Sequence, residues 1–115
     1  MTSRRILRLN EAIREELAEL LRREMRDPRL GGIISITEVD TSPDLALAHV
    51  YVSVLGSDEE TSDALRALRR AAGYLKRELG DRLRLRRVPN LDFRLDPSLA
   101  RGARVMELLR EIEQG

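Results

Sequence analysis

Residues 46–55, ALAHVYVSVL, alternate apolar and polar side chains more regularly than any other part of the chain. A period of two predicts a β-strand, and the alternation gives that strand one apolar and one polar face. The apolar face comprises Ala46, Ala48, Val50, Val52 and Val54, and the polar face comprises His49, Tyr51 and Ser53. The strand therefore belongs to a sheet that packs against other elements on one side only.

The segments before this strand predict a helix and a partner strand. Apolar residues at spacings of three and four indicate an amphipathic helix over residues 4–25, which Asp27-Pro28 ends because the residue before proline avoids the α region. After a turn at Gly31-Gly32, the β-branched run 33–39 predicts a strand. The turn cluster 41–44 joins this run to residues 46–55, so we expect a β-hairpin.

The segments after the hairpin predict a helical crossover and a third strand. Ser57 and Glu60 have the spacing of a capping box, which predicts a helix start, and Gly80-Asp81 predicts its end. A basic connector over residues 82–87, anchored by Leu83 and Leu85, then leads to a strand over residues 88–95. Its inward-facing residues are Leu91, Phe93 and Leu95.

The predicted elements make an α+β fold with a three-stranded mixed sheet and helices on one face. The third strand follows a helical crossover, so we expect it to run parallel to the second. Asp96-Pro97 suits a helix start, which predicts a final helix carrying apolar residues from Leu99 to Ile112.

Length and composition exclude several classes of protein. The 115 residues predict one domain, 1–115, and the absence of cysteine excludes disulfides and thiolate metal sites. His49 is the only histidine, and we expect it to be structural or exposed, without an evident partner. The carboxylates of the strands suit solvated edges and caps better than catalysis. No apolar run could span a bilayer, so we expect a cytoplasmic protein. The sequence has no Walker loop, GxSxG or HExxH motif, so we expect a protein that is not an enzyme and binds no metal or cofactor.

Residues 65–87 form the one strongly basic block, with nine Lys or Arg and two acids, whereas the whole chain has a net charge of +1. A concentrated positive field on a nearly neutral domain indicates a polyanionic partner, with RNA or DNA first. The alternative is a solvated helix face, and codon bias in a GC-rich genome would also favour arginine. The candidate binding residues are Arg66, Arg69, Arg70, Gly73, Lys76, Arg77, Arg82, Arg84, Arg86 and Arg87.

Ala71-Ala72-Gly73 lies in the middle of this helix-forming block. A glycine in a helix interior lowers helix stability by about 1 kcal/mol relative to alanine, so we expect Gly73 to have a structural or functional role. One interpretation is a helix kink at Ala71, Ala72 and Gly73 that lets a phosphate approach bare backbone. The alternative is a capping glycine between two ordinary helices, or close packing against the sheet. Both interpretations predict an interrupted helix.

Four segments together resemble ribosome-binding factor A, a family of bacterial small-subunit maturation factors. They are DPRL at 27–30, SITEVDTSPDLALAHVYVSVLG at 35–56, AAG at 71–73 and LRLRRVPNLDFRLDPSLARGARV at 83–105. The resemblance implies a KH-like fold of type II order, α-β-β-α-kink-α-β, with an additional C-terminal helix. KH domains clamp single strands with a GxxG loop, which this chain replaces with Ala71-Ala72-Gly73. Aromatic residues are also few, so we expect recognition of phosphates and the shape of folded RNA.

The resemblance also implies a partner and a role. The partner is the 30S ribosomal subunit, contacted through 16S rRNA, and the role is to assist late folding and 5′-end processing of that RNA. Cold adaptation is associated with the family, and a ribosome-associated GTPase or an initiation factor would assist release. Many relatives carry a longer, basic C-terminal tail, which the residues up to Gly115 do not include. We therefore assign none of the functions of that tail to this chain.

We expect a monomer. A different hypothesis, from the residues alone, is a protein-binding adaptor or dimerisation module that uses the sheet edge or the N-terminal helix. Salt dependence separates the two hypotheses, because phosphate contacts weaken steeply as salt rises.

Overall fold

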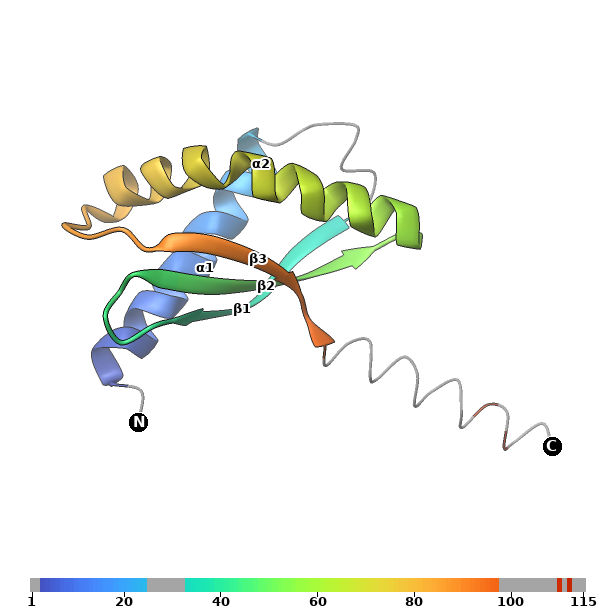
Figure 1. The fold of residues 1–115 in the computed structure, drawn as a ribbon, viewed down its shortest axis with the longest axis horizontal. Coiled ribbons are helices and arrows are strands. Elements are labelled where there is room, and N and C mark those ends of the chain that lie inside the picture. Colours follow the sequence, from blue (N-terminus) through green and yellow to red (C-terminus); the bar gives the residue numbers. More distant parts are fainter. Residues whose placement is uncertain (1–2, 25–32, 98–109, 111, 113–115) are drawn as a thin grey trace.

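The structure is a computed structural model, and it describes residues 3–24, 33–97, 110 and 112. Within these residues, two helices and three strands follow in the order helix, strand, strand, helix, strand (Figure 1). The elements are α1 (Arg4–Glu24), β1 (Ile33–Thr41), β2 (Leu47–Leu55), α2 (Asp58–Leu83) and β3 (Asn90–Leu95). This arrangement confirms the expected α+β class and its mixed sheet.

The sheet has the order β1-β2-β3, with β2 in the middle. β1 pairs with β2 antiparallel, as the hairpin prediction requires, and β3 pairs with β2 parallel. A parallel neighbour needs a long crossover between the two strands, and α2 provides it. Both predicted pairings are therefore confirmed.

One core joins both helices to one face of the sheet (Figure 1). Ala48, Val50 and Val52 of β2 are fully buried in it, as their alternation predicts. The helices and β3 contribute Ile13, Leu17, Leu20, Leu68, Leu75, Leu79, Leu91 and Phe93. The opposite face of the sheet carries the polar residues of each strand.

A bulge in β1 keeps the apolar residues of that strand on the buried face. Ile36 pairs with Val52 and Glu38 with Tyr51, which leaves Thr37 as the extra residue. In a regular strand, residues three positions apart point to opposite faces. Because of the bulge, Ile36 and Val39 are both buried, while Glu38 is exposed on the open face.

α2 is one continuous helix of 26 residues, and this corrects two expectations. Ser57 and Glu60 form the predicted capping box, but Ala71, Ala72 and Gly73 lie inside one helix, so the predicted division into two helices is wrong. The bend expected at these three residues stays a prediction. The cost of one helical glycine is about 1 kcal/mol, which is less than a single buried leucine contributes. A continuous helix buries Leu68, Leu75 and Leu79 along one stripe.

The predicted helix end at Gly80-Asp81 is also wrong, because α2 continues to Leu83. Arg84 ends the helix with a left-handed backbone, φ 51° and ψ 46°, and its N–H donates to Gly80 O. The connector between α2 and β3 therefore begins at Arg84, and Arg82 belongs to the helix. Gly80 has a packing role, since a Cβ there would lie 2.8 Å from Val88 Cγ2.

β3 begins two residues later than the sequence predicts. Pro89 has no N–H to donate, so the ladder starts at Asn90, whose N–H donates to Ala46 O at 3.0 Å. Leu91 and Phe93 are buried as predicted. Leu95 is 44% exposed, so its predicted inward position is wrong: it ends an edge strand, beyond the packed part of the core.

The predicted turn at Gly31-Gly32 lies outside the residues that the structure describes. Most of the predicted final helix, from Leu99 to Ile112, lies outside them as well. Both stay predictions.

Candidate nucleic-acid interface

The exposed side of α2 carries a stripe of arginines around Gly73. The helix buries Ala64, Ala67, Leu68, Leu75 and Leu79 on one side, and the helical period places the basic residues on the other. Arg66, Arg69, Arg70, Gly73 and Arg77 are all exposed. The prediction that these residues share one exposed face is confirmed, and we call Arg66, Arg70, Gly73 and Arg77 the α2 stripe.

The arginines of the α2 stripe have few carboxylates near them, so their positive charges are mostly not neutralised within the protein. Arg66 contacts Asp63 at 3.5 Å, but its side chain remains 69% exposed, so solvent screens this pair. Among the described residues, no carboxylate lies within ion-pair distance of Arg70 or Arg77. The stripe therefore presents to solvent a positive field that Asp63 offsets only at Arg66.

Two basic residues flank the stripe where α2 passes β3. Arg69 Nη2 donates to Phe93 O at 3.3 Å, and Lys76 Nζ donates to Asn90 Oδ1 at 2.8 Å. Both acceptors are neutral, so the two side chains keep their charges although these bonds direct them toward β3. Arg69 and Lys76 extend the positive surface from α2 toward that strand.

Arg82 does not belong with these residues. Its guanidinium contacts Glu16 Oε1 on α1 at 3.3 Å and Glu78 Oε2 on α2 at 3.5 Å. With two carboxylates around it, the Arg82 charge is compensated within the protein. The structure therefore gives Arg82 a role in joining the two helices, which sequence reasoning missed because Glu16 is far away in the chain.

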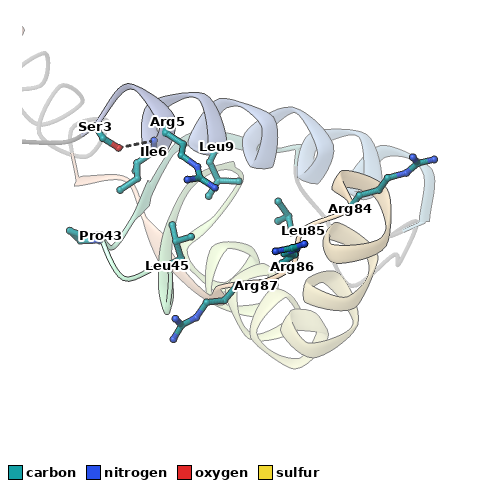
Figure 2. Close-up of a pocket in the computed structure, with 10 residues that line it drawn as sticks. All are labelled: Ser3, Arg5, Ile6, Leu9, Pro43, Leu45, Arg84, Leu85, Arg86 and Arg87. Atoms are coloured by element: carbon teal, nitrogen blue, oxygen red, sulfur yellow. Dashed lines mark hydrogen bonds between the residues drawn. The ribbon is translucent and has the colours of Figure 1, made fainter.

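The three connector arginines gather at a different place. Arg84, Arg86 and Arg87 line a groove with Arg5 of α1, and no residue of the α2 stripe lines it (Figure 2). The structure thus divides the predicted binding residues into the α2 stripe with its flank, the groove, and Arg82.

Gly73 lies at the middle of the α2 stripe with a helical backbone. No described glycine has a positive φ, and a Cβ at Gly73 would meet nothing within 4 Å. Close packing therefore does not require a glycine here. The missing side chain leaves the helix backbone bare between Arg70 and Arg77.

The open face of the sheet carries a polar cluster that the sequence did not reveal. His49 Nδ1 lies 3.0 Å from Asp92 Oδ2, and Arg94 Nε donates to the same oxygen at 2.7 Å. His49 therefore has a partner, contrary to expectation, because the parallel register places it opposite Asp92. Because His49 and Arg94 both contact Asp92 Oδ2, the three side chains help to hold β3 against β2.

The described residues offer little for other kinds of site. In this part of the chain, no three His, Cys, Asp or Glu side chains are grouped closely enough to hold a metal ion. No helix among the described residues combines the length and the apolar character needed to cross a bilayer.

Comparison with known proteins gives one consistent family. The family model described as Ribosome-binding factor A matches residues 5–109. Ribosome-binding factor A of Acetivibrio thermocellus is 47% identical over 107 residues, covering 93% of this chain and 87% of that protein. The Thermomicrobium roseum protein of the same name is 48% identical over 114 residues, covering 99% of this chain and 88% of that protein.

Solved structures agree with the sequence comparisons. The crystal structure of ribosome-binding factor A from Thermus thermophilus matches with a TM-score of 0.69 at 33% identity, covering 78% of this chain and 94% of that chain. A homology model of the Thermus thermophilus factor, fitted into a cryo-EM map of its complex with the 30S subunit, matches with a TM-score of 0.59 at 34% identity. That match covers 82% of this chain and 93% of the fitted chain.

Proposed function

The chain belongs to the ribosome-binding factor A family of non-enzymatic ribosome assembly factors, and from this premise we propose that it binds the 30S ribosomal subunit. The support is the full-length similarity and the 30S complex of the Thermus thermophilus relative. We further propose that the chain acts as one domain, in the cytoplasm where ribosomes assemble, and that it contacts 16S rRNA directly.

The observation that carries the RNA contact is the α2 stripe. Arg66, Arg70 and Arg77 present guanidinium groups along one exposed helix face, and no acidic residue occurs between residues 66 and 77. Guanidinium groups bind phosphate oxygens in a bidentate manner, which suits a sugar–phosphate backbone better than a neutral surface. Arg69 and Lys76 extend the same field toward β3.

Gly73 has a specific place in this proposal. The arginines on either side would hold two stretches of RNA backbone, and the bare helix between them leaves room for a ribose or phosphate to approach. A larger residue at position 73 would project from the centre of the α2 stripe. The glycine is then kept because it lets RNA approach the helix closely.

The proposed activity is binding itself. A protein that binds one local arrangement of 16S rRNA more tightly than the others shifts the folding equilibrium by that difference in affinity, and no bond is made or broken. Late folding and 5′-end processing of 16S rRNA are the steps that such stabilisation would assist. Release follows when the RNA reaches an arrangement that no longer fits the α2 stripe.

The salt dependence of binding to purified 30S subunits tests the proposal. Each neutralised phosphate releases counterions, so log affinity should fall linearly with log salt. Exchanging Arg70 and Arg77 for glutamate should reduce the slope by about two, one for each lost phosphate contact. Binding that is insensitive to salt would instead support the alternative of a protein-binding module.

A further inference from the structure

A groove of about 630 Å³ lies between the start of α1, the β1–β2 turn and the connector from α2 to β3. Ile6 and Leu9 of α1 face Leu45 of the turn and Leu85 of the connector across it (Figure 2). Arg5 and Arg86 lie beside these aliphatic side chains, whereas Arg84 points outward (Figure 2). The groove therefore has an aliphatic floor and a basic rim.

Two residues that line the groove have unusual backbone conformations. Among the described residues, only Leu45 and Arg84 combine a side chain with a positive φ, at 61° and 51°. Glycine or asparagine adopts this region at lower cost, and a bulky residue there costs on the order of 1–3 kcal/mol. The backbone conformation therefore does not favour a leucine at position 45, and the Leu45 side chain lines the groove.

The basic residues of the groove lie on two of its sides, Arg5 on α1 and Arg84, Arg86 and Arg87 on the connector. None of the described residues that line the groove is acidic, and the first turn of α1 has Arg4 and Arg5 in place of the acids that favour a helix N-terminus. Among the described residues, no carboxylate lies within ion-pair distance of Arg5 or Arg86. Hydrogen bonds from Ser42 and the Ala46 N–H lower the pKa of nearby Asp44, with help from the charge of Arg87, so Arg87 is partly compensated.

We propose that this groove binds an acidic, amphipathic segment of a partner protein. Aliphatic side chains of the segment would pack on Leu45 and Leu85, and its carboxylates would pair with Arg5 and Arg86. The positive end of the α1 dipole would stabilise the same carboxylates. This interaction surface is separate from the α2 stripe and does not depend on RNA binding there.

The composition of the groove favours a protein segment over an RNA strand. The groove residues that the structure describes include no aromatic side chain, and unpaired bases are usually held by stacking on aromatic rings. Aliphatic floors instead accept leucine-like side chains at helical spacing, with the flanking charges setting orientation. The α2 stripe differs from the groove, because its arginines lie on either side of exposed helix backbone and not beside a floor of aliphatic side chains.

The proposal is tested by NMR titration of the full ¹⁵N-labelled chain with three probes. The first is a short synthetic peptide of Leu and Glu with leucines at helical spacing, the second a Leu–Lys peptide of the same spacing, and the third an oligouridine. The Leu–Glu peptide should shift the amides of Ile6, Leu45 and Leu85. The Leu–Lys peptide should shift none of them, and oligouridine should shift none of them either.

Two variants locate the site. Leu45→Asn removes the aliphatic contact while relaxing the left-handed backbone, so it should weaken peptide binding about tenfold with an unchanged or higher melting temperature. A purely structural role for Leu45 would lower the melting temperature instead. Arg5→Glu with Arg86→Glu should abolish peptide binding, whereas the matched pair Arg70→Glu with Arg77→Glu should leave it intact.

Three outcomes would overturn the proposal. The groove amides could fail to respond to the Leu–Glu peptide at millimolar concentration. Oligouridine could displace the peptide or shift the groove amides itself, which would assign the groove to RNA. The same amides could shift with protein concentration alone, which would assign the groove to a second copy of the chain.

Discussion

His49 on β2 and Asp92 on β3 are paired residues of the parallel ladder, and their side chains are joined by a 3.0 Å hydrogen bond between Nδ1 and Oδ2. Arg94 holds the same carboxylate. The contacts connect the central strand to the edge strand β3 on the face of the sheet away from the helices, and they make the stability of the fold sensitive to the charge of Asp92.

We expect Asp92→Asn to destabilise the protein at neutral pH and not in acid. Partial burial raises the pKa of Asp92, but hydrogen bonds from Arg94 and His49 outweigh it, so the pKa lies below its ordinary value. The ionised group therefore stabilises the fold above its unfolded pKa of about 3.9, and this contribution is lost as pH falls through the lower folded value.

Because the side chain is one-third exposed, with a relative accessibility of 33%, solvent screening limits this contribution to about 1 kcal/mol or less. Urea unfolding of both proteins at about pH 7 and about pH 3 measures it, since the difference in stability between the two proteins should be smaller at the lower pH. A loss of equal size at both pH values would show that the contact does not act through the Asp92 charge.

The two helical glycines of α2 should respond in opposite directions to alanine. Gly73→Ala has free space around it and should stabilise the protein by about 0.5–1 kcal/mol through helix propensity. Gly80→Ala places a methyl group 2.8 Å from Val88 Cγ2, and overpacking costs about 1–3 kcal/mol, so the melting temperature should fall.

A double-mutant cycle provides the control for position 80. Combining Gly80→Ala with Val88→Ala removes the clash, and the cost of the alanine at 80 should then shrink. Equal costs in both backgrounds would rule out the Val88 contact as the cause. Weaker 30S binding by the more stable Gly73→Ala variant would support the proposed close approach of RNA to the bare helix.

Asn10 of α1 should be among the more sensitive polar residues. It is 8% exposed, and its Oδ1 accepts the Thr41 N–H at 3.0 Å where β1 ends. Asn10→Ala leaves that buried N–H unsatisfied, so thermal or chemical unfolding should show a loss of about 1–3 kcal/mol. Asn90→Ala is the control, because it removes only an exposed hydrogen bond with Lys76 and should change stability by no more than about 0.5 kcal/mol. Similar losses in both variants would contradict this account.

Arg82 should behave as a structural residue and Arg70 as a binding residue. Arg82→Ala removes the contact with Glu16 that joins α2 to α1, so it should lower stability by up to about 1 kcal/mol and leave 30S binding unchanged. Arg70→Ala should leave stability unchanged and weaken 30S binding. Pelleting assays with 30S subunits, read beside the unfolding curves, separate the two roles; a stronger binding defect from Arg82→Ala would reverse the assignment.

Local patterns predicted much of the fold. The alternation around Val50 and Val52 correctly gave the buried face of β2, and the Ser57–Glu60 spacing gave the start of α2. Such signals depend on neighbouring residues only. The continuity of α2 through Gly73 could not be predicted in the same way, because it depends on tertiary burial that outweighs the weak propensity of one residue.

Only those parts of the candidate site that depend on local spacing could be predicted from the sequence. Helical spacing placed Arg66, Arg70 and Arg77 on one face, and the structure agrees. Glu16, which Arg82 contacts on α1, and Asp92, which His49 contacts on β3, lie 66 and 43 residues away along the chain, so no local pattern revealed these two contacts. The groove around Leu45 and Arg86 is assembled from three separate segments and becomes visible only in the fold.

The most direct test of the central claim is co-sedimentation of the Arg70→Glu/Arg77→Glu variant with purified 30S subunits at moderate salt. The control is Arg4→Glu/Arg8→Glu, which makes the same change in net charge on exposed positions of α1. Circular dichroism confirms that both variants are folded. If the α2 stripe binds 16S rRNA, the α2 variant should lose at least about tenfold in affinity, about 1.4 kcal/mol, while the control should pellet nearly as the unmodified protein does. Equal retention of both variants with the 30S pellet would contradict the claim.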